Sequence, residues 1–99
     1  MTQTTSSNKP VLIDKENIGD LKFPENEVLK SKEDILTRAR NLERALKLGN
    51  LQHSKIKIVF EDTQGIKQVD TTIWGVTDKR IILKHGVLIP IHCIHELKE

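Results

Sequence analysis

The sequence has few aromatic residues, one cysteine and no long apolar run. Two Phe, one Trp and no Tyr occur among its 99 residues. Because Cys93 is the single cysteine, an internal disulfide is excluded and a reducing compartment is the natural setting. The apolar runs are too short to span a bilayer, and the N-terminus lacks the apolar region of an export signal. We therefore expect a cytoplasmic protein without membrane contact.

The sequence also lacks a strong excess of charge of either sign. Its 16 Lys and Arg oppose 14 Asp and Glu, which gives a net charge of +2. A charge so near zero does not draw the whole molecule to nucleic acid or membrane, so a charged ligand must be recognised by a local patch. The sequence contains no glycine-rich phosphate loop, dinucleotide motif or pair of carboxylates suited to acid–base catalysis. It thus predicts a protein that is not an enzyme and needs no cofactor.

The residues that are present divide the chain into two parts. Residues 1–30 are polar at first and then hold only scattered apolar positions without a sustained period, so we expect a flexible N-terminal arm. Residues 31–99 hold most of the apolar residues and are numerous enough for one modest core. We expect a single domain of one helix and several strands there.

A helix is predicted from residue 32 to about residue 48. Ser31 suits the N-cap, and Asp34 follows where negative charge favours the positive end of a helix. Apolar residues then recur at helical spacing along one face, at Ile35, Ala39, Leu42, Ala45 and Leu46. Gly49 follows the last turn, at the position where a left-handed residue commonly ends a helix.

Five short strands are predicted after the helix. Residues 55–60 alternate charged and apolar side chains, which turns Ile56, Ile58 and Phe60 inward. Residues 61–65 form a hairpin loop, and residues 67–76 form a long strand with a bend or bulge at Gly75. The remaining segments are a turn at 77–79, a strand at 80–84, a tight turn at 85–86, a strand that ends at Pro90, a short turn at 91–93 and a last strand from Ile94.

The order of these elements predicts the fold class. Short strands with tight connections after one amphipathic helix favour a closed sheet over a flat one. We expect an α+β protein, mainly β, in which an N-terminal α-helix is followed by a five-stranded antiparallel small barrel of Sm-like or SH3-like type.

Two stretches within the predicted strands carry a resemblance to a known family. Residues 76–84 read Val-Thr-Asp-Lys-Arg-Ile-Ile-Leu-Lys, and residues 88–95 read Leu-Ile-Pro-Ile-His-Cys-Ile-His. They resemble the turn and third strand, and the fourth strand with its histidine-containing segment, of the bacterial Sm-like RNA chaperone family (host factor Q). The resemblance covers residues 35–99 and implies that His92 lies where the family has its RNA-lining histidine.

The chain departs from that family at several positions. Ile91 stands where the family has a lysine, Pro90 replaces an aromatic residue, and Val76 and Lys79 stand where aromatics are expected. Bases of single-stranded RNA stack on such aromatics, so these departures remove the family's stacking platform. The same order of elements also resembles the Rof-like inhibitors of transcription termination, which implies a protein-binding regulator.

Basic residues and one histidine are the candidates for contact with nucleic acid. One stripe of the predicted helix is basic, one predicted turn carries two basic residues, and the family resemblance adds a histidine. These six residues are Arg40, Arg44, Lys47, Lys79, Arg80 and His92. A simpler explanation for the helical stripe is that its cations answer the helix dipole and pair with acids, such as Glu43 with Lys47.

Three side chains that can ligate metal occur within residues 92–95. Along a strand, however, His92 points away from Cys93 and His95, and a structural zinc site needs four ligands. We therefore expect no metal, and we expect Cys93 in the core as a small apolar residue. Trp74, the only tryptophan, is expected in the core or half-buried.

Two functions stay open on the sequence alone. The first is a non-enzymatic binding module for single-stranded RNA, with contacts from the basic helix stripe and the His92 region. The alternative is a protein-interaction module, in which strand edges pair with a partner or with copies of the same chain.

Overall fold

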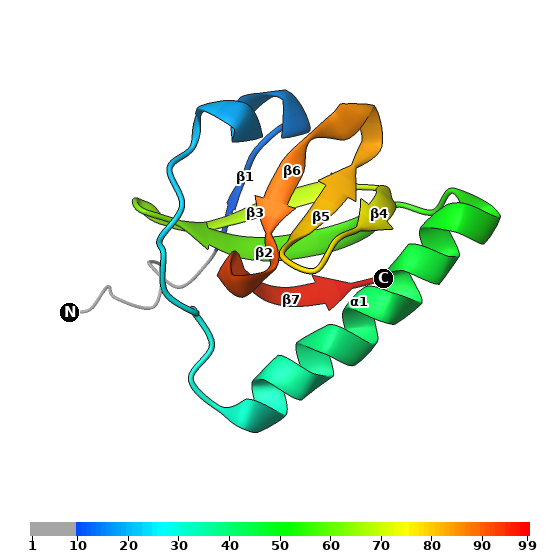
Figure 1. Ribbon diagram of the computed structural model, residues 1–99. Helices are drawn as coiled ribbons and strands as arrows, with labels where there is room; N and C mark the ends of the chain where they lie inside the picture. Colours follow the sequence, from blue (N-terminus) through cyan, green and yellow to red (C-terminus); the bar gives the residue numbers. More distant parts are fainter. Residues whose placement is uncertain (1–9) are drawn as a thin grey trace.

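The computed structural model describes residues 10–99 (Figure 1). It contains one long helix, seven short strands and three 3₁₀ helices. In chain order these are β1 (Val11–Leu12), the 3₁₀ helix η2 (Lys15–Asp20), α1 (Lys32–Gln52), β2 (Ile56–Asp62), β3 (Gly65–Thr71), β4 (Ile73–Val76), β5 (Arg80–Leu83), the 3₁₀ helix η3 (Lys84–Gly86), β6 (Leu88–Pro90), the 3₁₀ helix η4 (Ile91–Cys93) and β7 (Ile94–Lys98).

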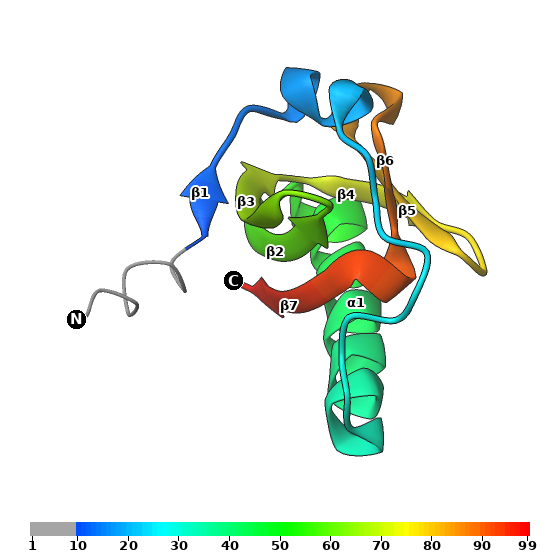
Figure 2. The ribbon, with the colours of Figure 1, turned by 90° about the vertical axis from the view of Figure 1, so that its left-hand side faces the viewer.

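The strands form two separate sheets. The four-stranded sheet has the order β1-β3-β2-β7, and the three-stranded sheet has the order β4-β5-β6. All neighbouring strands are antiparallel except β1 and β3, which run parallel with Val11 opposite Lys67. Figure 2 shows β5 and β6 on the side of the molecule away from β1, so the two sheets form facing layers with α1 along one side.

The predicted closed barrel is wrong, because the described strands form two open sheets. The long strand expected over residues 67–76 is broken at Thr72, and the bend or bulge expected at Gly75 is present as a register shift between Ile73 and Gly75. The Thr72 carbonyl accepts a hydrogen bond of 3.0 Å from the Lys84 amide, and its hydroxyl donates to the His53 carbonyl at 3.4 Å. These contacts take Thr72 out of the ladder between β2 and β3, so β4 starts a second sheet.

The predicted N-terminal position of the helix is also wrong. In the described residues β1 and η2 precede α1, which lies in the middle of the chain. The capped start is confirmed, since the Ser31 hydroxyl accepts a hydrogen bond of 3.0 Å from the Asp34 amide. The helix ends later than expected, at Gln52, with His53 in the left-handed conformation. None of the helices in residues 10–99 combines the length and apolar character needed to cross a membrane.

The core lies between the two sheets and α1. The inward positions predicted for β2 are confirmed, because Ile56, Ile58 and Phe60 are at most 3% exposed. The Phe60 ring meets the Phe23 ring with their centroids 6.1 Å apart. The other fully buried apolar side chains are Ile18, Val69, Ile73, Ile81, Leu83, Ile89, Cys93 and Ile94. Burial of each such side chain contributes about 1.5–3 kcal/mol.

Residues 10–30 pack against the rest of the molecule. Ile18 in η2 is 1% exposed and belongs to the core, and the Ile13 amide donates a hydrogen bond of 2.9 Å to the Gln68 carbonyl beyond the end of β1. The apolar residues of this segment lacked a sustained period because its two regular elements, β1 and η2, are short and differ in type. The flexible arm was predicted over residues 1–30. Its first nine residues lie outside the described part of the chain. The predicted boundary between arm and domain at residue 31 stays a prediction.

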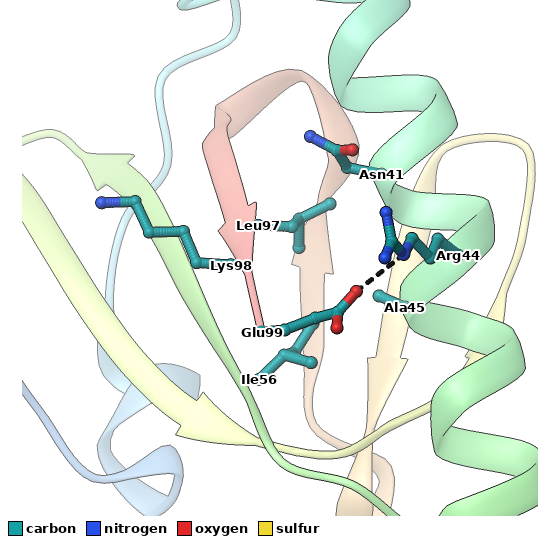
Figure 3. Close-up of a pocket in the computed structure, with 7 residues that line it drawn as sticks. All are labelled: Asn41, Arg44, Ala45, Ile56, Leu97, Lys98 and Glu99. Atoms are coloured by element: carbon teal, nitrogen blue, oxygen red, sulfur yellow. Dashed lines mark ion pairs between the residues drawn. The ribbon is translucent and has the colours of Figure 1, made fainter.

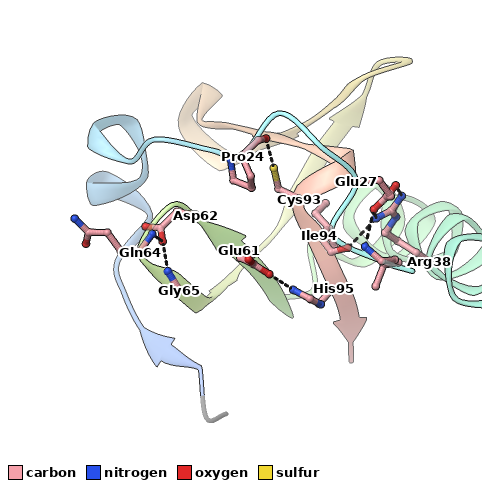
Figure 4. A network of polar contacts seen from close by, with 11 residues as sticks. Pro24, Glu27, Arg38, Glu61, Asp62, Gln64, Gly65, Cys93, Ile94 and His95 are labelled. Carbon is pink, nitrogen blue, oxygen red and sulfur yellow. Dashed lines mark hydrogen bonds and ion pairs between the residues drawn. The ribbon is translucent and has the colours of Figure 1, made fainter. Parts of the chain in front are cut away.

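The turn between β2 and β3 is held by one buried carboxylate. One Asp62 side-chain oxygen accepts hydrogen bonds of 2.9 Å from the amides of Gln64 and Gly65, and the carboxylate also pairs with Lys67 at 2.9 Å. Figure 4 shows Asp62 pointing back into this turn. The hairpin predicted over residues 61–65 is confirmed in position and is tighter than expected, because β2 extends to Asp62 and β3 begins at Gly65.

Candidate functional site

A tight turn between β4 and β5 presents two neighbouring cations. The Thr77 hydroxyl accepts hydrogen bonds from the amides of Lys79 at 3.3 Å and Arg80 at 2.9 Å, and the Thr77 amide donates to the Arg80 carbonyl at 2.8 Å. Such Ser or Thr turns fix the backbone locally. Lys79 and Arg80 are both exposed. Neither forms an ion pair with a side chain in residues 10–99.

A groove beside this turn joins the end of β6 to α1. Its volume is about 400 Å³, and it is lined by Arg38, Asp78, Lys79, Arg80, Pro90, Ile91 and His92. We call these residues the cationic groove. Two backbone links hold its walls, because Arg80 pairs with Pro90 in the sheet and the Ile91 amide donates to the Lys79 carbonyl at 2.9 Å. The structure therefore brings together three of the six predicted site residues, Lys79, Arg80 and His92.

His92 is fixed in the groove by the segment before α1. Its Nε2 lies 2.7 Å from the Pro24 carbonyl oxygen, and its own carbonyl accepts from the Val28 amide at 3.0 Å. A carbonyl can only accept, so Nε2 carries the hydrogen in this contact. In the neutral ring Nδ1 is then an acceptor, and in the charged ring it is a second donor. His92 thus contributes a ring of fixed orientation to the groove.

Arg38 is a site residue that sequence reasoning missed. It is 5% exposed, and its guanidinium donates to both carboxylate oxygens of Glu27, at 2.7 and 2.5 Å, and to the Ile94 carbonyl at 2.9 Å (Figure 4). The hydrogen bonds from Arg38 lower the pKa of Glu27, although partial burial acts the other way. The sequence did contain a signal that Arg38 would be buried, because it lies at helical spacing from Leu42 on the buried face of α1.

The basic helix stripe lies apart from the cationic groove and is largely paired. Arg44 contacts Glu99 at 2.7 Å across a small cleft between α1 and β7 (Figure 3), and Lys47 lies 3.9 Å from Glu43. Arg40 is exposed beside Glu43. The pairing of Lys47 with Glu43 matches the simpler explanation for this stripe. A role of Arg40, Arg44 and Lys47 in RNA binding stays a prediction.

The other reactive side chains near His92 are engaged. Cys93 is fully buried, as predicted, and burial followed by the nearby Glu27 and Glu61 charges raises the pKa of its thiol to about 11. His95 Nε2 lies 2.7 Å from Glu61 (Figure 4). Residues 10–99 bring no three His, Cys, Asp or Glu side chains close enough to hold a metal ion. Since the thiolate is the nucleophilic form, the burial and the raised pKa of Cys93 both disfavour its reaction in the folded protein.

Trp74, expected in the core or half-buried, is about half-exposed on the surface. It is 51% exposed at the start of β4, and its ring centroid is 6.2 Å from that of the exposed His85 in η3. The β4–β5 register shifts between Ile73 and Gly75, so Trp74 stands in a bulge without a partner across the ladder. Ile73 before it is fully buried, so the alternation of side chains along β4 points the indole away from the core.

The cationic groove offers positive charge, an oriented imidazole and the apolar surfaces of Pro90 and Ile91. Cations of this kind attract phosphates, and the one acidic side chain that lines the groove is Asp78. A scan against protein-family models and searches of curated proteins and of solved structures found no match to this chain.

Proposed function

We propose that this protein is a non-enzymatic binding module that holds single-stranded RNA in the cationic groove. The observation that carries this proposal is the convergence of Lys79, Arg80 and His92 on one groove, with the two cations exposed and without an acidic partner in the described residues. Single-stranded nucleic acid is commonly bound by cations that follow the backbone, beside surfaces that accept bases.

Three further points support this choice. The two stretches that we propose to resemble bacterial Sm-like RNA chaperones, residues 76–84 and 88–95, contain six of the seven groove residues, although Lys79, Pro90 and Ile91 depart from that family's pattern. The local charge also fits, because residues 72–92 contain Lys79, Arg80 and Lys84 against one acid, Asp78. The cytoplasm is the location we propose, since RNA and a reduced lone cysteine are both at home there.

The proposal is tested by replacing the two groove cations together, as Lys79→Ala with Arg80→Ala. Binding of a short labelled oligouridylate is measured by fluorescence anisotropy over a series of salt concentrations. Each lost phosphate contact removes about 0.7 from the salt slope of single-strand binding, so we expect the slope to fall by about 1.4. Affinity is expected to fall roughly tenfold near 0.2 M salt, and by more at lower salt.

The matched control replaces two cations that already have acidic partners, Arg44→Ala with Lys47→Ala. It removes the same charge from the helix stripe, and we expect it to change affinity less than the groove variant does. Equal losses in the two double variants would refute the groove as the site. No binding of RNA by the unaltered protein at low salt would refute the function itself.

A protein-interaction module is the second candidate, and the open sheet edges favour it. In the described residues β6 pairs only with β5, and β7 pairs only with β2, so each has one edge without a strand. Free edges can pair with a strand of another protein or of a second copy. Sedimentation at rising concentration tests self-association: growth in mass supports it, and a constant monomer mass counts against it.

A further inference from the structure

The outward face of the three-stranded sheet carries an exposed aromatic residue that the cationic groove does not use. Trp74 is 51% exposed, and Leu88, on β6, is 44% exposed. Ile82 pairs with both Gly75 and Leu88, while its neighbours Ile81 and Leu83 are fully buried, so Ile82 and Leu88 share the outward face. Figures 1 and 2 show this sheet on the outside of the molecule.

The bulge in β4 gives Trp74 a defined place on that face. Gly75 packs against Ile82, where an added Cβ would come within 3.4 Å of the Ile82 side chain. The His85 ring stands 6.2 Å from the Trp74 ring at an angle of 45°, and His85 itself has a left-handed backbone with φ of 70°. Two exposed rings are thus held side by side, with the exposed Lys84 next to His85.

Three exposed cations lie at the two ends of β5. Lys79 and Arg80 stand at the start of β5, and Lys84 stands just after its end. At about 3.3 Å per residue, β5 places these two positive ends about 10–15 Å apart. None of the three forms an ion pair with a side chain in residues 10–99. Aromatic rings between cations are the pattern that binds single-stranded nucleic acid through stacked bases and paired phosphates.

We infer that Trp74 is a base-stacking position, and that single-stranded RNA runs from the cationic groove across Ile82 and Leu88 to the Trp74–His85 pair. This inference rests on the proposed function and names how that ligand is held. The family resemblance places stacking aromatics at the turn before β5 and at Pro90, where this sequence has no aromatic residue. Trp74 supplies an aromatic contact at a different position, on β4. The phosphates lie toward Lys79, Arg80 and Lys84, and a base covers the indole.

The experiment uses the one tryptophan of the chain as its own reporter. The full chain is titrated with unlabelled oligouridylate, and the Trp emission is followed while anisotropy of labelled RNA gives the affinity. We expect quenching of Trp74 that saturates with the anisotropy curve. Trp74→Ala is expected to weaken binding roughly 5- to 150-fold, the range that follows from the loss of one stacked base.

Two further variants keep the result interpretable. Trp74→Phe retains a ring and is expected to keep most of the affinity, while Leu36→Ala removes another exposed apolar side chain, 60% exposed on α1, and is expected to bind as the unaltered protein does. Thermal unfolding followed by circular dichroism checks that each variant is folded. Loss of binding in Trp74→Ala but not in Leu36→Ala supports the inference.

The outcomes separate this inference from the proposed function. RNA binding without quenching, or with full affinity in Trp74→Ala, overturns the stacking position and leaves the cationic groove in place. No RNA binding at all overturns both. A change of Trp74 emission with protein concentration alone, without RNA, assigns the face to a second copy of the chain and likewise overturns the inference.

Discussion

Two charged residues, Arg38 and Asp62, lie among the buried side chains, and each is held by a carboxylate or an ammonium partner. Arg38 satisfies its guanidinium through Glu27 and the Ile94 carbonyl. Breaking such a pair by removing one member leaves the other charge buried, which costs more than the pair itself contributes. Glu27 thus links the segment before α1 to the helix, and Arg38 in turn links both to β7 through the Ile94 carbonyl.

Replacing Glu27 with Gln is expected to destabilise the protein by about 1–2 kcal/mol at neutral pH, because Arg38 loses its negative partner. The Arg38 hydrogen bonds lower the pKa of Glu27 in the folded state below its ordinary 4.5. The stabilisation is therefore present above 4.5 and is lost as the pH falls through the folded pKa. Urea unfolding at neutral and acidic pH measures the difference, which should shrink in acid.

Glu25→Gln is the matched control, since Glu25 is exposed and has no ion pair in the described residues. Its stability should follow that of the unaltered protein at both pH values. A stability gap between Glu27→Gln and the unaltered protein that persists unchanged in acid would contradict the role given to the carboxylate.

At the scale of single residues, local chemistry could be predicted and distant pairing could not. Ser31 was identified as a cap because its partner lies three residues away, and Cys93 as a core residue because it is small and apolar. Arg38 pairs with residues 11 and 56 positions away, which no local pattern encodes. Trp74 is about half-exposed because it follows the fully buried Ile73 on β4, and a prediction that treated residues 67–76 as one strand did not assign it to a face.

At the scale of elements, Gly49 shows why the helix runs past its predicted end. A side chain at this position would overlap the carbonyl oxygen of Ile73, so the absence of a Cβ lets α1 cross closely over the start of β4. The glycine thus serves a close approach between helix and strand, and the left-handed residue that ends the helix is His53. A glycine near the end of a helical pattern can either end the helix in a left-handed conformation or allow a close approach of another element, and the sequence pattern is the same in both cases.

Replacing Gly49 with Ala is expected to destabilise the protein by about 1–3 kcal/mol through overlap with β4. The intrinsic preference of Ala for helices, about 1 kcal/mol, acts in the opposite direction and is included in that net value. Thermal or urea unfolding measures the change. Gly19→Ala is the control, because a Cβ there meets no atom within 4 Å; a Gly49→Ala protein as stable as this control would show that α1 shifts freely.

The positions of the strands after α1 were predicted within a few residues from alternation and turn residues alone, whereas β1 was not among the predicted strands. The break at Thr72 was not predicted either, because it depends on hydrogen bonds to His53 and Lys84, which come from other elements. Lys79, Arg80 and His92 were each identified as candidates, yet their convergence depends on the pairing of Arg80 with Pro90. The components of the site were therefore readable in the sequence, and its assembly was not.

At the scale of the whole molecule, the two sheets stay open because the edge strands β6 and β7 do not pair with each other in the described residues. The 3₁₀ helix η4 separates β6 from β7 along the chain, and the two strands belong to different sheets. The core is completed from the N-terminal side, where Ile18 inserts with 1% exposure and joins the core cluster. A segment that looked unstructured in the sequence therefore supplies a full core residue.

This insertion has a consequence for the order of folding. Val11 pairs with Lys67, so β1 and Ile18 reach their places only after a long loop has closed, whereas the β2–β3 hairpin forms between neighbours. We expect Ile18→Val to cost about 1 kcal/mol and to raise the unfolding rate about fivefold while leaving the folding rate unchanged. Ile58→Val in the hairpin should instead slow folding, and stopped-flow kinetics in urea distinguish the two. The segment that leads the described chain is then the last to join the native state.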